Sequence, residues 1–293
     1  PHAPHIAATA DPWPGGVAVY QSATDANYRL NTVVRRPSVV GVTRTVLEPA
    51  SPGLIDIGPD MEVKLRHGTL ETIEDQALLS GGNLAAIGDG STDTWEVFQF
   101  GKAELVAPDT FRLSRRLRGQ AGTDAIASGL WPEGSVFVLL DSRPEQIDFS
   151  PALRRSLQHF RIGPATRPLE DPVYRYRVES FKGNGLRPLS PCHLRARKTA
   201  NGDYDVSWIR RTRIDGDTWE TPEVPLGEER EQYQVGVFQQ GEMVRMIETT
   251  QAGWTYTSAA QQQDGLDGAF DVTVAQISAT YGPGPVQRLY VGV

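Results

Sequence analysis

The chain has 293 residues, enough for two average domains, and 39% of them are hydrophobic. Its 29 Lys and Arg against 36 Asp and Glu give a formal net charge of -7, which argues against nucleic-acid binding. The single cysteine, Cys192, excludes an intrachain disulfide and a cysteine-cluster metal site. The longest apolar run, VFVLL at 136–140, is too short for a membrane span, and no signal peptide is recognisable, so we expect no membrane insertion.

Short runs rich in Val, Ile, Thr, Tyr and Phe alternate with turn residues along most of the chain. This spacing predicts an all-β protein with one or two antiparallel sandwich or barrel units before a C-terminal sandwich. Residues 1–16 are rich in proline and glycine and predict an extended lead-in, and the start at Pro1 rather than Met indicates part of a longer polypeptide. Residues 71–82 predict one or two helical turns that end at Gly81 and Gly82.

Residues 95–119 predict an antiparallel hairpin whose turn contains Pro108 and Asp109. Strict alternation in the second strand places Arg115 on the face of Phe111, Leu113 and Leu117. The opposite face then carries Arg112, Ser114, Arg116 and Arg118. We therefore expect these three arginines to lie on a solvent-exposed face, with a polyanion-binding stripe or a contact to another subunit as the alternatives. The following GQAGTD lacks the pattern of a phosphate-binding loop.

Later signals divide the chain into domains. Residues 135–141 predict a buried strand, and Ser150 followed by Pro151 predicts the start of a short helix. The segment from 164 to 172 is rich in proline and is the best boundary. We thus expect a β-rich domain over 17–165, made of one or two subdomains, a linker and bridging strand over 166–190, and a last domain over 191–293.

The last hundred residues contain seven short predicted strands, which fit a two-sheet sandwich. Their order and the position of Trp208 resemble the fibronectin type III pattern. Phe270 stands where such modules often carry a tyrosine, so we expect the corner hydrogen bond of that tyrosine to be absent. A long loop between the second and third strands contains Trp219 and the pair Glu228 and Glu229, and it either contacts a partner or folds back onto the sandwich.

No motif in the sequence supports catalysis. The five histidines lack metal-ligand spacing, no nucleophile elbow is present, and two calcium-like loops lack the full ligand set. We expect no enzymatic activity, no metal and no cofactor.

Two blocks, residues 95–141 and 188–235, carry a family resemblance, and together they cover about a third of the chain. Both are similar to the C-terminal region of the large tail-tip proteins of alphaproteobacterial gene transfer agents and related siphophages, the baseplate "megatron" or host-specificity proteins. In that family a TIM-barrel, glycosidase-like domain lies toward the N-terminus. These 293 residues show no counterpart of it, so no catalytic residue is carried over.

The resemblance implies a virion component located at the tail tip or baseplate. It implies a subunit of a homotrimer that contacts the tail hub and other baseplate proteins and takes part in host attachment, with a host capsule or outer-membrane glycan as a further candidate partner. The positions that match the family are expected to be structural or interface residues: Trp95, Arg112, Arg115, Arg118, Gly119, Gly122, Thr123, Trp208, Arg210, Arg211, Trp219 and Glu228.

A competing interpretation is a carbohydrate-degrading or carbohydrate-binding cell-surface module. The degrading form predicts a groove lined by Trp95, Trp131 or Trp219 with two facing carboxylates. The binding form predicts glycan recognition without assembly into a particle.

Overall fold

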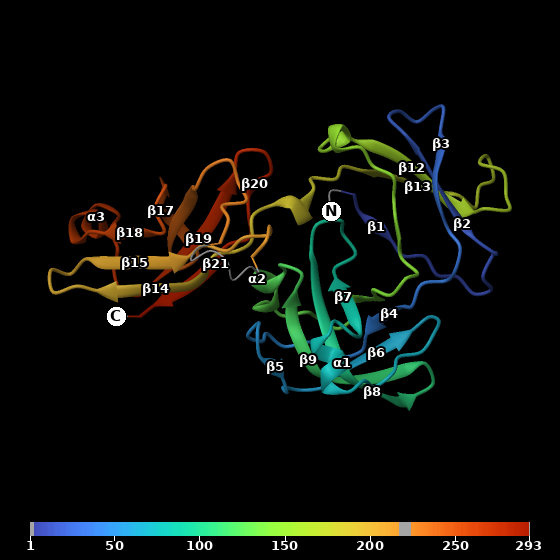
Figure 1. Ribbon diagram of the computed structural model, residues 1–293, viewed down its shortest axis with the longest axis horizontal. Coiled ribbons are helices and arrows are strands. Elements are labelled where there is room, and N and C mark those ends of the chain that lie inside the picture. The colour runs from blue at the N-terminus through green and yellow to red at the C-terminus, as the bar shows by residue number, and fades with distance from the viewer. Residues whose placement is uncertain (1–2, 217–223, 293) are drawn as a thin grey trace. The chain divides into compact units, whose positions relative to one another are not determined.

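The computed structural model describes residues 3–216 and 224–292, and these residues form a nearly all-β protein, which confirms the predicted fold class. The chain divides into two compact units, Pro1–Gly185 and Leu186–Val293, each of which is built from its own sheets (Figure 1). The short 3-10 helix η2 (Asn184–Leu186) lies where the two units meet along the chain. Among the described residues, no helix has the length and apolar character needed to cross a membrane.

A closed antiparallel barrel forms much of the first unit. Its sheet runs in the order β5 (Ile55–Asp56), β9 (Thr110–Gln120), β6 (Met61–Leu65), β4 (Val40–Thr43), β10 (Val136–Leu139), β7 (Leu84–Gly88) and β8 (Trp95–Ala107). Because β8 also pairs with β9, the six strands from β9 to β8 close into a ring. The short strand β5 pairs with β9 beyond the end of β6.

Most of the barrel interior is apolar because most inward positions on successive strands carry large hydrophobic side chains. Met61, Val63, Phe98, Phe100 and Phe137 are fully buried there. The helical turns predicted over 71–82 are present as a shorter helix, α1 (Asp75–Leu79). Its Leu78 is fully buried. A second short helix, α2 (Asp124–Ala127), follows β9.

The predicted hairpin is confirmed as β8 and β9, joined at Pro108 and Asp109. Asp109 adopts a φ of 56°, in the left-handed region, where Asp is tolerated more readily than most side chains. The carbonyl of Asp109 accepts from the N–H of Leu65 at 2.8 Å, which ties the turn to β6.

The first unit also contains a four-stranded antiparallel sheet in the order β13 (Arg175–Glu179), β12 (Gln158–Pro164), β2 (Val17–Ser22) and β3 (Arg29–Val34). The proline-rich segment 164–172 joins β12 to β13 within this sheet. In the predicted lead-in, β1 (His5–Ile6) pairs with β11 (Glu145–Gln146). The buried side chains beside this sheet include Ala3, Val19, Phe149 and Phe160.

A 3-10 turn rather than an α-helix follows Ser150. This element, η1 (Pro151–Leu153), has the predicted cap, in which the Ser150 hydroxyl accepts from the N–H of Ala152 at 3.3 Å.

The second unit is a β-sandwich of two antiparallel sheets, as the regular spacing of its strands predicts. One sheet contains β14 (Cys192–Lys198), β15 (Tyr204–Ile209) and β18 (Gly253–Tyr256). The other contains β17 (Glu242–Thr249), β16 (Tyr233–Gln239) and β19 (Phe270–Ser278), with β20 (Gly282–Pro283) and β21 (Gln287–Val291) both paired to β19. The helix α3 (Ser258–Gln263) follows β18, capped by the Thr257 hydroxyl.

Aromatic contacts join the two sheets of the sandwich. Trp208 lies edge-on to Tyr233, with ring centroids 5.1 Å apart, and Phe270 packs against Tyr204 and Tyr256. Phe270 has no hydroxyl to donate, but Tyr256 donates to the Asp264 carboxylate at 2.6 Å. Arg245 binds both oxygens of the same carboxylate, at 2.6 and 2.8 Å, so Asp264 anchors the segment after α3.

Candidate functional site

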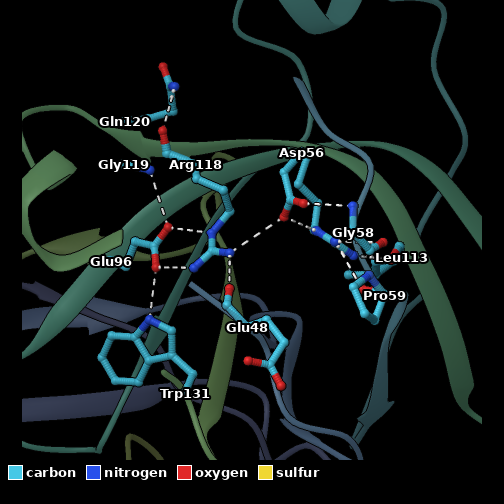
Figure 2. A network of polar contacts seen from close by, with 11 residues as sticks. Glu48, Asp56, Gly58, Pro59, Glu96, Leu113, Arg118, Gly119, Gln120 and Trp131 are labelled. Atoms are coloured by element: carbon cyan, nitrogen blue, oxygen red, sulfur yellow. Dashed lines mark hydrogen bonds and ion pairs between the residues drawn. The ribbon is translucent and has the colours of Figure 1, made fainter. Parts of the chain in front are cut away.

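A buried ion pair between Arg118 and Glu96 is the centre of a polar network in the barrel wall (Figure 2). The Nε and Nη2 of Arg118 donate to the two Glu96 carboxylate oxygens at 2.6 and 2.8 Å. The same carboxylate accepts from the indole N–H of Trp131 at 2.8 Å and from the N–H of Gly119 at 3.2 Å. Glu96 and Arg118 are both fully buried, so each charge depends on these partners for its stabilisation.

A second buried arginine, Arg116, holds residues 56–59. Its Nε donates to Asp56 at 2.9 Å, its Nη2 donates to the carbonyl of Pro59 at 2.9 Å, and its Nη1 donates to the carbonyl of Leu113 at 2.9 Å. Arg118 reaches the same stretch of chain, since its Nη1 donates to the carbonyl of Glu48 at 2.8 Å and lies 3.5 Å from Asp56. The two arginines of β9 therefore fasten residues 48–59 to the barrel.

The predicted solvent-exposed face of β9 is wrong for Arg116 and Arg118, and Arg115 explains why. Arg115 adopts a φ of 54°, a left-handed conformation inside a strand. Before it the buried hydrophobic side chains, Phe111 and Leu113, have odd numbers, and after it the buried side chains, Arg116 and Arg118, have even numbers. A single irregular residue reverses which side chains point inward, because side chains alternate along a strand.

The remaining predicted arginines of β9 are partly exposed. The side chain of Arg112 is 41% exposed, and its Nη2 lies 3.1 Å from the Glu62 carboxylate. The Nη2 of Arg115 donates to both oxygens of Asp75 at 2.7 Å, and both side chains are partly exposed. The prediction of a solvent-exposed face thus fits Arg112 alone among its three arginines.

The electrostatic state of Asp56 follows from its surroundings. Burial alone would raise the pKa of this carboxyl, but hydrogen bonds from Arg116 and the N–H of Gly58, with the charges of Arg116 and Arg118, lower it below 3.8. Asp56 is therefore charged at neutral pH and neutralises part of the guanidinium charge. All three nitrogens of each buried guanidinium donate hydrogen bonds. The arrangement is suited to holding the chain in one conformation.

The other predicted residues of the first block stabilise turns around this network. The indole N–H of Trp95 donates to the carbonyl of Ser91 at 2.7 Å. A Cβ on Gly119 would lie 2.6 Å from the Cα of Asp124, and Gly119 and Gly122 both have positive φ. The hydroxyl of Thr123 accepts from the N–H of Val97 at 2.9 Å and donates to Gln120. Each of the two glycines meets a conformational requirement that a larger residue satisfies poorly.

The second block lies in the other unit. Trp208 is a core residue there, and Arg210 donates to the carbonyls of Val224 and Pro225 at 2.8 Å. Arg211 donates to the carbonyl of Ser190 at 3.3 Å, and Glu228 lies 3.1 Å from Arg213. Trp219 lies outside the described residues. These residues fix the connections of the sandwich, and any interface role for them remains a prediction.

Sequence reasoning missed the acceptors of the network, which are the carboxylates of Glu96 and Asp56 and the main-chain carbonyl of Glu48. One signal was available for Glu96. It shares its side of β8 with Phe98 and Phe100, which are fully buried. An acid at an inward position of such a strand requires a cationic partner. Asp56 and Glu48 carry no comparable pattern.

Two of the three tryptophans of the competing groove pack elsewhere, and the third, Trp219, lies outside the described residues. Trp131 is 6% exposed and is hydrogen bonded to Glu96, and Trp95 packs against Gly88. The described residues also hold no group of three or more His, Cys, Asp or Glu side chains suited to a metal ion.

Comparison with protein families relates the barrel region to a known sequence family. Residues 38–138, about a third of the chain, match the family described as Rcc01698-like, C-terminal. The matched range coincides with the barrel strands from β4 to β10. Rcc01698 is a gene of the Rhodobacter gene transfer agent, so this region is related to a gene transfer agent protein. No curated protein sequence matched the chain.

Three solved structures to which the chain is similar have low TM-scores. Domains d3-d4 of the rat CD45 extracellular region are 8% identical, with 53% of this chain and 72% of that chain covered and a TM-score of 0.28. The FN1-FN3 domains of chicken CNTN1 are 11% identical, with coverage of 86% and 66% and a TM-score of 0.26. The glycoside hydrolase domain of Endo-D, Spr0440, from Streptococcus pneumoniae R6 is 10% identical, with coverage of 80% and 31% and a TM-score of 0.23.

Proposed function

We propose that this chain is a structural component of the tail tip, or baseplate, of a gene transfer agent or related phage-like particle. The observation that carries the proposal is the family match over residues 38–138, which coincides with the closed barrel. The resemblance of residues 95–141 and 188–235 to the tail-tip "megatron" proteins supports the same role and extends into the sandwich.

The physical properties of the barrel agree with a structural role. Two buried arginines fasten residues 48–59 to β9 through one carboxylate and three main-chain carbonyls. This stretch presents Leu54 and Ile57, which are 67% and 80% exposed. Fixing the segment before it meets a partner reduces the entropy lost on association. We propose that the chain acts by assembly into the tail tip and host attachment, without enzymatic activity.

The proposed partners follow from the same resemblance. They are two further copies of the chain in a homotrimer, the tail hub with other baseplate proteins, and a host capsule or outer-membrane glycan. The location that goes with these partners is the virion, at the tip of its tail.

An in-frame deletion of the segment that encodes residues 38–138 tests this proposal in the cells that carry the gene. We expect DNA-filled particles whose tails lack a tip or fail to form, and restoration by the unaltered gene supplied from a plasmid. Electron microscopy of the released particles, together with their adsorption to recipient cells, gives the measurement. Tails and adsorption identical to those of unaltered particles would argue against a role in the tip.

A further inference from the structure

Two adjoining hollows lie beside β3 in the four-stranded sheet of the first unit. The larger has a volume of about 470 Å³ and is lined by residues that include Gln21, Arg29, Asn31 and Gln158. The smaller has a volume of about 420 Å³. Asn31 and Asp148 line both hollows and are hydrogen bonded to each other, and we call the larger hollow the β3 groove.

A row of three side-chain amides crosses the floor of the β3 groove, one from each of three neighbouring strands. The Nδ2 of Asn31 on β3 donates to the Oε1 of Gln21 on β2 at 2.6 Å. The Nε2 of Gln21 in turn donates to the Oε1 of Gln158 on β12 at 2.9 Å. Gln158 is 3% exposed and donates to the carbonyl of Leu157 at 2.9 Å. These bonds fix the orientation of the row before any ligand arrives.

Within the amide row, Gln21 keeps hydrogen-bonding capacity for a ligand, whereas Asn31 has used both of its donor hydrogens and Gln158 is buried. A side-chain amide has two donor hydrogens and an oxygen with two acceptor sites. The two hydrogen bonds of the Gln21 side chain use one donor hydrogen and one acceptor site, so one donor hydrogen and one acceptor site remain for a ligand. The walls add Ser22, Ser150 and the exposed charges of Arg29 and Asp148, with Leu30 and Leu153 as the main apolar surface.

We infer that the β3 groove binds a glycan, with consecutive sugar rings lying across the row of amides. Sugar hydroxyls are donors and acceptors at once, as are the Gln21 amide and the Ser150 hydroxyl that line the groove. Apolar patches of sugar rings fit against Leu30, which is 55% exposed, and Leu153. Volumes of this order suit one or two sugar rings per hollow.

Other ligand classes fit the groove less well. A strong anion would face the carboxylate of Asp148 as well as the guanidinium of Arg29. A metal ion would find one carboxylate and no histidine in the lining.

This inference rests on the proposed function in one respect, since it gives a site to the glycan partner named there. It also stands alone physically, because the groove lies in the four-stranded sheet, outside the barrel that carries the family match. An experiment with isolated glycans therefore separates the two ideas. Glycan binding can fail while the chain still proves to be a tail-tip component, and the reverse also holds.

The test uses the purified 293-residue chain on an array of immobilised bacterial capsular polysaccharides and lipopolysaccharide O-antigens, with titration calorimetry on the glycans that bind. We expect saturable binding to at least one glycan, weakened about tenfold or more in Arg29→Ala and Gln21→Leu. Arg177→Ala is the matched control, since it removes an exposed arginine from β13 at the opposite edge of the same sheet and should leave the affinity unchanged.

Three results would overturn the inference. One is the absence of saturable binding to any glycan on the array by a chain whose circular dichroism shows the all-β fold. Another is binding that Arg29→Ala and Gln21→Leu leave intact. The third is loss of self-association, measured by sedimentation, in Arg29→Ala without any glycan binding, which would make the groove a contact between copies. Arg29 is exposed, so its variant remains informative if Gln21→Leu does not fold.

Discussion

Arg118 and Glu96 form a two-pronged ion pair inside the barrel wall, with N–O distances of 2.6 and 2.8 Å and no exposed surface on either side chain. Removing two charges from water is costly, and a buried ion pair often adds no net stability over apolar residues of similar volume. The pair fixes positions instead, since Arg118 also holds the carbonyl of Glu48 and Glu96 also holds Trp131 and Gly119.

Replacing Arg118 by alanine should therefore destabilise the first unit by about 3–5 kcal/mol, because Glu96 would remain buried without its countercharge. Arg115→Ala is the matched control. Its ion pair with Asp75 is partly exposed and should contribute about 0–1 kcal/mol. Hydrogen exchange of peptides from β8 and β9 measures the loss of stability in the first unit separately from the second. Equal protection from hydrogen exchange in the two variants would contradict the structural role of Arg118. Normal tail-tip assembly by the Arg118 variant would also contradict it.

Asp56 should make the stability of the first unit depend on pH in the acidic range. Its pKa is lowered in the folded state, so its stabilising effect is fully present above its ordinary pKa of 3.8 and is lost as the pH falls through the lower folded value. Asp56→Asn should cost about 2 kcal/mol at pH 7 and progressively less below pH 3.8. Melting temperatures of both proteins between pH 7 and pH 3 provide the check. A difference that stays constant across this range would show that the charge of Asp56 contributes nothing.

The left-handed conformation of Arg115 predicts an unusual order of substitutions. Arg115→Gly should be tolerated, because glycine adopts a φ of 54° without steric cost. Arg115→Ile should be less stable than the glycine variant by about 1–2 kcal/mol, although isoleucine ordinarily favours strands. Both variants lose the Asp75 ion pair, so this comparison isolates the conformation. Denaturant unfolding gives the two free energies, and a more stable isoleucine variant would contradict the left-handed conformation at this position.

In the sandwich, Tyr256→Phe should lower stability by about 1 kcal/mol, since it removes only the hydroxyl that donates to Asp264. Asp264→Ala should cost more, because Arg245 would then lose both of its carboxylate contacts. Hydrogen exchange in β18 and α3 reports the change. Equal effects of the two substitutions would mean that Asp264 does not anchor this segment.

The sequence predicted the elements that depend on local chemistry. Alternating residues and a Pro-Asp turn located the β8 and β9 hairpin, and Ser150 before Pro151 located the 3-10 turn. Trp208 was expected in the sandwich core and lies there. In each case neighbouring residues are sufficient to determine the local structure.

Other features depend on contacts between distant segments. Nothing near Arg115 in the sequence requires a left-handed residue, so the burial of Arg116 and Arg118 could not be read from alternation. Their partners come from residues 48–59 and 96, and the amides of the β3 groove come from three strands between residues 17 and 164. Only the folded sheets bring these side chains together.

The most direct test of the proposed tail-tip role is immunogold electron microscopy of particles released by cells that carry the gene, with antibodies raised against the 293-residue chain. We predict gold at the tail end distal to the head, and none on particles from cells that lack residues 38–138 when the antibodies are affinity-purified on that segment. Labelling confined to heads, or a chain that never sediments with particles, would contradict the proposed function.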